Sequence, residues 1–303
     1  MIDLALVLIA LQAGPAGLVP IEASPFTLRC SPPLARRTER LATGLPATLS
    51  RLRRSLDAPP LPPTNLYLLL GPSAPRDGPL GSLLEAMPEW AAGVAFPGAH
   101  AAVIRVDRIG SYGQRELSGV VAHEIVHLLM AEAAASGPGR PEMPRWFSEG
   151  VASNLAGQGE WLDFIYFWVS GVASSPQPLA RLQASFEEAG SAATRNAAYA
   201  GSFEFVRFLI RRHSARFPAR VLAGLRAGLG FQQAYARATG TTLRMDEARW
   251  ASSRRGMRRW MAIMTSPLTL WSVITFLFLL AYGAKKLRSR RLMRRWQEDD
   301  LIR

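Results

Sequence analysis

Two histidines four residues apart, His123 and His127, flank Glu124 in the segment HEIVH. On an α-helix, positions four apart lie on one face, so both imidazoles can reach one metal ion. Catalytic zinc takes three protein ligands and keeps a position for water, and two histidines with a carboxylate form one common set. Glu149, in the segment WFSEG, is the candidate third ligand. This set could hydrolyse a peptide or amide bond by attack of a zinc-bound water, with Glu124 as the general base.

Two helices are needed to position these residues. Apolar side chains recur at helical spacing between Glu116 and Ala134, which predicts one helix that carries both histidines. Residues 137–141 (GPGRP) predict a loop, and Pro144 suits the first turn of a second helix that carries Glu149. The alternative is that the histidines are an ordinary half-buried pair and Glu149 a solvated helix carboxylate.

The segments HEIVH and PRWFSEGVA resemble those of the gluzincin metallopeptidases, specifically the small bacterial peptidase MA-like domains. The resemblance implies zinc as the cofactor, with His123, His127 and Glu149 as its ligands and Glu124 as the catalytic base. It also implies a thermolysin-like α+β fold, with a small N-terminal sheet and a mostly helical C-terminal half. Peptides or proteins would then be the substrates.

The resemblance suggests further expectations around the site. Related gluzincins place a tyrosine or histidine from a later helix beside the oxyanion, and Tyr199 opens such a helix here, so Tyr199 is the candidate donor. The alternative is that Tyr199 forms the edge of a core helix. Better-known gluzincins often have an aspartate one turn after the third ligand, whereas this chain has Ser153 and Asn154. The groups that orient the zinc histidines are therefore unassigned.

Two segments before the histidines concern the sheet. Residues Gly93–Phe96 are similar to the family's glycine-rich turn. The strand Ala101–Val106 is similar to the family's edge strand, to which an extended peptide could add by main-chain hydrogen bonds. A plain core strand is the equal alternative.

An aromatic cluster within residues 161–168 could line a substrate pocket, although such clusters more often belong to the core.

Residues 266–284 (SPLTLWSVITFLFLLAYGA) carry no charge and match the thickness of a bilayer's hydrocarbon core. They predict a transmembrane helix, with a buried core helix as the alternative. The basic run in residues 285–303 predicts a cytoplasmic tail, although the arginines within 254–259, on the other flank of the span, favour the opposite orientation. The apolar run Ile2–Leu11 resembles a signal peptide, with an uncleaved anchor as its rival. The catalytic domain is therefore expected outside the cytoplasm of a single-pass membrane protein.

The predicted organisation is a signal peptide or anchor at 1–17, a metallopeptidase domain at 25–255, a membrane helix at 266–284 and a basic tail. The net charge of +13 comes almost entirely from arginine, and we assign it to membrane lipid rather than to nucleic acid. Cys30 is the only cysteine, so no intramolecular disulfide can form. Two functions from different classes remain, a zinc peptidase and a catalytically inactive scaffold or receptor in a membrane complex.

Overall fold

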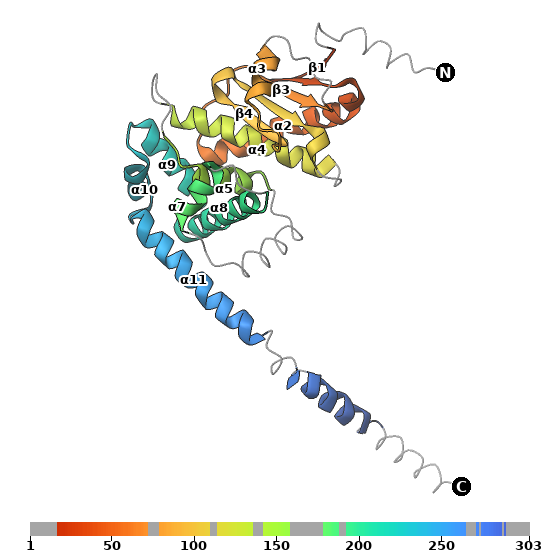
Figure 1. Ribbon diagram of the computed structural model, residues 1–303, viewed down its shortest axis with the longest axis vertical. Helices are drawn as coiled ribbons and strands as arrows, with labels where there is room; N and C mark the ends of the chain where they lie inside the picture. Colours follow the sequence, from red (N-terminus) through yellow and green to blue (C-terminus); the bar gives the residue numbers. More distant parts are fainter. Residues whose placement is uncertain are drawn as a thin grey trace, which may run out of the picture. The chain divides into compact units, whose positions relative to one another are not determined.

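The computed structural model describes residues 17–71, 79–109, 114–135, 142–157, 178–187, 192–264, 271–272, 274–286 and 288. The chain divides into two compact units, Met1–Trp250 and Ala251–Arg303. The first unit has a mixed α+β fold that is mostly helical and contains a small five-stranded sheet (Figure 1). This confirms the expected α+β class.

The sheet has the strand order β1-β2-β3-β5-β4. Its strands are β1 (Val19–Ala23), β2 (Phe26–Cys30), β3 (Thr64–Leu69), β4 (Gly93–Phe96) and β5 (Ala101–Arg105). Strands β2, β3 and β5 are parallel, whereas β1 and β4 run antiparallel to their neighbours and form the two edges. The hypothesis that the segment from Ala101 is an edge strand is therefore wrong, and the segment Gly93–Phe96, expected as a turn, is the edge strand.

Strand β5 lies inside the sheet because its side chains fill a core on each face. Ala102 and Ile104 pack in the larger core, with helices α2 (Ala35–Leu56) and α4 (Gln114–Ala134). Val103 packs on the other face, in a smaller core with Leu80 of α3 (Pro79–Ala86). A continuous apolar run is typical of a strand that is buried on both faces. Figure 1 shows α3 and the two longer helices on opposite sides of the sheet.

Strand β1 begins before residue 25, the predicted start of the domain. Its five residues pair with β2 from Val19↔Cys30 to Ala23↔Phe26. Pro20 lies within it, and proline is tolerated in an edge strand because an outward-facing N–H is not needed for the ladder. The folded domain therefore includes residues that we had expected to lie between a targeting segment and the first strand.

Helix α4 is the central element of the first unit. It contacts β4 and β5 on one side and helices α5 (Arg145–Leu155) and α9 (Phe217–Arg226) on the other. Within the described part of the chain it is the one helix long and apolar enough to cross a membrane, over Leu117–Ala134. Because 67% of that segment is buried inside the domain, we interpret it as a core helix. Its position places the two histidines between the sheet and the helical half.

The helical half is built around the packing of α5 against α8 (Ala192–His213). This contact requires a glycine, since a Cβ on Gly150 would lie 2.5 Å from the Ser202 carbonyl oxygen and 2.5 Å from a Val206 methyl group. The other helices among the described residues of this half are α7 (Leu179–Glu187), α9, α10 (Phe231–Thr239) and α11 (Leu243–Met264). Buried aromatic side chains join them, with Trp146 of α5 packed against Phe205 and Phe231.

Asp246 ties the start of α11 to the rest of the helical half. Its carboxylate is fully buried and accepts hydrogen bonds from the Tyr235 hydroxyl at 2.8 Å and the Thr241 hydroxyl at 2.6 Å. His213 Nε2 lies 2.8 Å and Arg212 Nε 3.1 Å from its two oxygens. Burial alone would raise the pKa of Asp246, but these hydrogen bonds and the charge of His213 lower it to about 2. The ionised carboxylate thus joins α8, α10 and α11.

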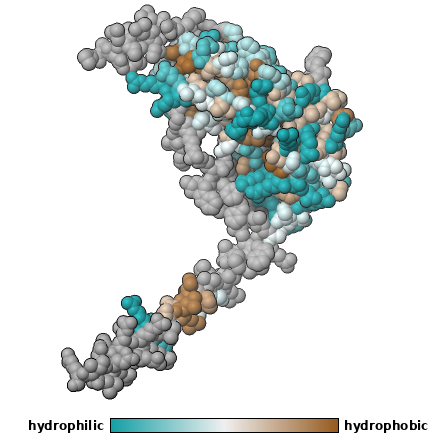
Figure 2. All heavy atoms as spheres, turned by 180° about the vertical axis from the view of Figure 1, so that it is seen from behind, coloured by the Kyte–Doolittle hydropathy of each residue, from teal (hydrophilic) through white to brown (hydrophobic). Residues whose placement is uncertain are grey.

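In the second unit, residues 271–272 and 274–286 are helical. Their apolar side chains are exposed, as shown by Trp271 at 66% and Phe278 at 69%, and Figure 2 shows this surface in brown. Residues 266–270 and 273 of the expected membrane helix lie outside the described residues. The same holds for the N-terminal run up to residue 16 and for the aromatic cluster within 161–168.

Candidate metal centre

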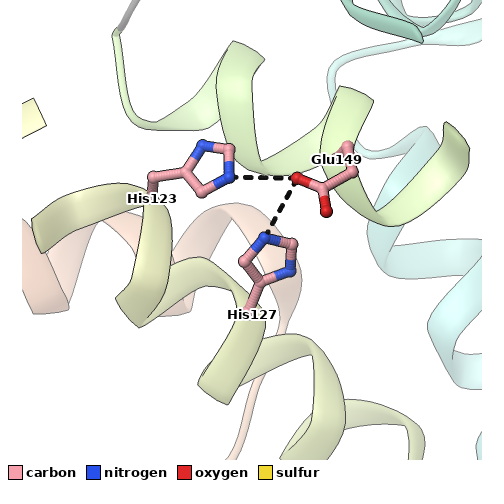
Figure 3. Close-up of side chains that lie close together, drawn as sticks. All are labelled: His123, His127 and Glu149. Carbon is pink, nitrogen blue, oxygen red and sulfur yellow. Dashed lines mark hydrogen bonds and ion pairs between the residues drawn. The ribbon is translucent and has the colours of Figure 1, made fainter. Parts of the chain in front are cut away.

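The three predicted metal ligands come from two helices that pack on each other. His123 and His127 lie one turn apart on α4, and Glu149 lies on α5, which begins after the N-cap residue Pro144. Because α4 and α5 are in direct contact, the carboxylate reaches the histidine face of α4. Figure 3 shows both imidazole rings pointing toward Glu149. The structure therefore brings together all three residues that the sequence selected.

The distances among these side chains match a tetrahedral zinc site. Glu149 Oε2 lies 3.2 Å from His123 Nε2 and 3.4 Å from His127 Nε2. Two ligand atoms bound to a tetrahedral zinc at the usual bond lengths lie about 3.3 Å apart. One potential ligand atom from each residue lies within 4.8 Å of the other two. The donor set and the two distances from Glu149 Oε2 fit zinc, and the three side chains are nearly buried.

Glu149 has the charge state that a metal ligand needs. Burial alone would raise the pKa of its carboxyl group, but the charges and hydrogen bonds of His127 and His123 hold that pKa well below its usual value. The group is therefore ionised in the metal-free protein at neutral pH. An ionised carboxylate beside two histidines supplies the anionic ligand that a zinc site needs once the imidazoles are neutral.

Glu124 lies beside the ligand cluster and faces edge strand β4. A Cβ on Gly93 would lie 2.5 Å from Glu124 Oε1, which shows how closely the carboxyl group packs against that strand. The pKa of Glu124 is raised to about 7. Burial and the charge of Glu149 raise it, whereas the charge of His123 and the Ala95 backbone N–H lower it by a smaller amount. A carboxyl group with a pKa near the working pH is suited to accept a proton and then return it.

Tyr199 of α8 interacts electrostatically with Glu149, Arg145 and Glu124. Its ring packs edge-to-face on Phe186 of α7, with 5.2 Å between centroids. Burial raises the pKa of its hydroxyl above the usual value, and the charge of Glu149 raises it further, whereas Arg145 lowers it by charge and a hydrogen bond. The hydroxyl therefore stays protonated and can donate a hydrogen bond. Its role as oxyanion donor stays a prediction.

Two polar residues that the sequence did not suggest touch the ligands. Ser148 Oγ lies 2.9 Å from His127 Nδ1. The Arg145 guanidinium lies with Nε 3.4 Å from Glu149 Oε1. The i,i+4 spacing of Arg145 and Glu149 is a sequence signal that could have identified this pair. No comparable signal exists for Ser148, because its contact depends on how α5 is rotated against α4.

Asn154, at one of the two positions where related gluzincins carry an aspartate, forms hydrogen bonds away from the histidines. Asn154 Nδ2 donates hydrogen bonds to the Gly150 carbonyl at 2.7 Å and to the Phe203 carbonyl at 2.9 Å. The side chain therefore joins α5 to α8 rather than supporting a zinc ligand.

The comparison with known families agrees with this geometry. The sequence profile of the peptidase MA superfamily matches residues 47–255, which is more than half of the chain. The chain belongs to the peptidase MA superfamily. The matched region contains all three potential ligands and Glu124, and it ends near the boundary between the two compact units at Trp250. No curated protein is similar enough to the chain to count as a match.

Proposed function

We propose that this chain is a zinc-dependent peptidase of the gluzincin type. The observation that carries the proposal is the convergence of His123, His127 and Glu149, beside a buried Glu124 whose pKa is about 7. When bound, zinc would lower the pKa of a water molecule and polarise the scissile carbonyl. Glu124 takes the proton of that water and passes it to the leaving amine. Tyr199 donates a hydrogen bond to the oxyanion.

Edge strand β4 supplies the surface for the substrate in this proposal. It is the last strand of the sheet, and its Ala95 backbone N–H interacts with Glu124, so the open side of the strand faces the general base. An extended peptide that adds to β4 by main-chain hydrogen bonds has its backbone presented to Glu124. Main-chain recognition of this kind makes peptides or proteins the substrate class.

Loss of metal and loss of turnover separate the proposed roles. His123→Ala, His127→Ala and Glu149→Ala should each lose zinc, whereas Glu124→Gln should keep zinc and lose hydrolysis. Zinc content is measured by mass spectrometry and turnover on a quenched peptide library. Full zinc occupancy in Glu149→Ala protein would remove that residue from the ligand set.

A catalytically inactive scaffold is the second candidate. It needs the metal ligands but has no chemical use for a buried carboxyl group with a raised pKa, so the presence of Glu124 favours the peptidase. Equal turnover by the wild type and by Glu124→Gln protein, at background level, would support the scaffold.

We also propose that residues 266–284 anchor the protein in the cell membrane, with the catalytic domain outside the cytoplasm. Support comes from the exposed apolar side chains of residues 274–280 and from the cations that follow, which are Lys285, Lys286 and Arg288. Cations next to a membrane helix favour the cytoplasmic side. The apolar N-terminal run is consistent with export.

A further inference from the structure

A histidine that binds a metal through Nε2 must carry its proton on Nδ1. That N–H usually donates to an acceptor that fixes the orientation of the ring. In this chain Ser153 and Asn154 stand where related gluzincins have an aspartate, and the Asn154 side chain donates to the carbonyl groups of Gly150 and Phe203. The groups that orient the ligands must be found elsewhere.

For His127 the acceptor is the hydroxyl of Ser148. The ring places Nε2 3.4 Å from Glu149 Oε2 and Nδ1 2.9 Å from Ser148 Oγ, so its two nitrogens face a ligand atom and a hydroxyl oxygen respectively. With Nε2 bound to a metal, Nδ1–H donates to Ser148 Oγ. Because Ser148 directly precedes Glu149 on α5, one turn of helix supplies both a ligand and the group that orients another ligand.

For Glu149 the orienting group is the guanidinium of Arg145. Oε2 faces both imidazoles, while Oε1 lies 3.4 Å from Arg145 Nε on the opposite side of the carboxylate. A cation at Oε1 holds the plane of the carboxylate and leaves Oε2 for the metal.

Arg145 is itself fixed by α7. Its backbone N–H donates to Gln183 Oε1 at 2.8 Å, and one guanidinium nitrogen lies 3.4 Å from the Phe186 carbonyl oxygen. The guanidinium carbon also lies 5.2 Å from the centroid of the Phe186 ring. Helix α7 therefore fixes the position of Arg145, and Arg145 in turn orients the carboxylate of Glu149.

We propose that Ser148 and Arg145 are positioning residues for the metal site. They supply the orienting contacts in a chain that has no aspartate at positions 153 and 154. The inference rests on the proposed zinc site. A neutral hydroxyl orients His127, and a cation orients Glu149. Loss of such outer contacts typically weakens metal binding by about 10- to 100-fold.

The test measures zinc affinity in the full-length protein in detergent, by competition with a chromophoric chelator. Ser148→Ala should weaken zinc binding about 10- to 100-fold, and Ser148→Thr, which keeps the hydroxyl, should restore most of it. Ser55→Ala is the control: among the described residues its hydroxyl donates only to the Arg51 carbonyl within α2, so its loss should change the affinity less than about twofold, on the scale of an ordinary surface substitution. Affinity is the right quantity because Arg145 also interacts with Tyr199, so activity alone would mix two effects.

Arg145→Met keeps an unbranched apolar stem as far as the position of Nε and removes the charge. We expect about 10-fold weaker zinc binding. The Co²⁺-substituted protein should also show an altered visible absorption spectrum, because a carboxylate released at Oε1 can approach the ion with both oxygens. A loss of packing alone would lower the melting temperature without changing the spectrum of the bound cobalt.

The outcomes distinguish this proposal from the zinc site on which it rests. If the wild type binds no zinc, the proposed function fails. If the wild type binds zinc tightly and both Ser148→Ala and Arg145→Met bind it equally well with unchanged cobalt spectra, the zinc site stands and the positioning roles are refuted.

Discussion

Gly93→Ala places a methyl group against the proposed general base. The new Cβ would lie 2.5 Å from Glu124 Oε1 and 3.0 Å from both Cδ and Cγ. Ordinary van der Waals contact begins near 3.4 Å, so the carboxyl group must retreat by about 0.9 Å. Gly93 lies in a regular strand, so alanine causes no backbone strain there and the effect is confined to this contact.

Gly93→Ala should lower both the rate of catalysis and the stability of the fold. A misplacement of about 1 Å at a reacting group can cost on the order of 100-fold in rate, so kcat should fall by about that factor. Overpacking a buried contact costs about 1–3 kcal/mol of unfolding free energy. Zinc content should stay at the wild-type level, because none of the three ligands is among the atoms nearest to the new methyl group.

The assay combines turnover, zinc content and chemical denaturation. Gly44→Ala is the control, since its new methyl group meets nothing within 4 Å on the exposed face of α2 and should add about 0.5–1 kcal/mol of stability without changing kcat. Combining Gly93→Ala with Glu124→Asp shortens the clashing side chain, and the double variant should recover part of the lost stability. A Gly93→Ala enzyme with wild-type kcat and melting temperature would refute the placement of Glu124 against β4.

Three further predictions concern other parts of the molecule. Tyr199→Phe should lower kcat by roughly 10- to 1,000-fold with KM unchanged, and with a stability loss below about 1.5 kcal/mol; a normal kcat would leave Tyr199 as a packing residue. Asp246 has a lowered pKa, so its contribution of about 2 kcal/mol is present above pH 4 and lost as the pH falls toward 2. Thermal melts of Asp246→Asn and wild type should therefore converge in that window, and parallel curves would contradict the pKa. A reporter that is active only in the cytoplasm should be active when it is fused after Arg303. If protease added to intact cells digests that fusion and spares the catalytic domain, the orientation is the opposite of the one proposed.

The cluster of His123, His127 and Glu149 was predictable because it depends largely on local periodicity. His123 and His127 share a face on any α-helix, and proline and glycine residues before Glu149 separate the two helices. Sequence alone could not show that α5 packs on α4 with its carboxylate turned toward the histidines. On another face of α5, Gly150 lets the helix approach α8.

The order of the strands was harder to predict, although the sequence held relevant signals. The run Ala101-Ala-Val-Ile104 is apolar at every position, which is typical of a strand buried on both faces and favours the core alternative. The short segment Gly93–Phe96 has too few residues for its alternation to be informative. Its glycine is required by the carboxyl group of Glu124, a residue 31 positions later in the chain.

The contacts around the ligands show where prediction from sequence ends. Arg145 lies four residues before Glu149, so helical spacing alone places the two side chains near each other. Ser148 and His127 belong to different helices, and their contact exists only because the rotation of α5 is fixed by the packing of Trp146 and Phe147 in the aromatic core. The orientation of His127, a proposed metal ligand, is therefore set by apolar packing on the far side of the helix that carries Ser148. If the proposed zinc site is correct, substitutions in that core should alter metal binding without touching the site.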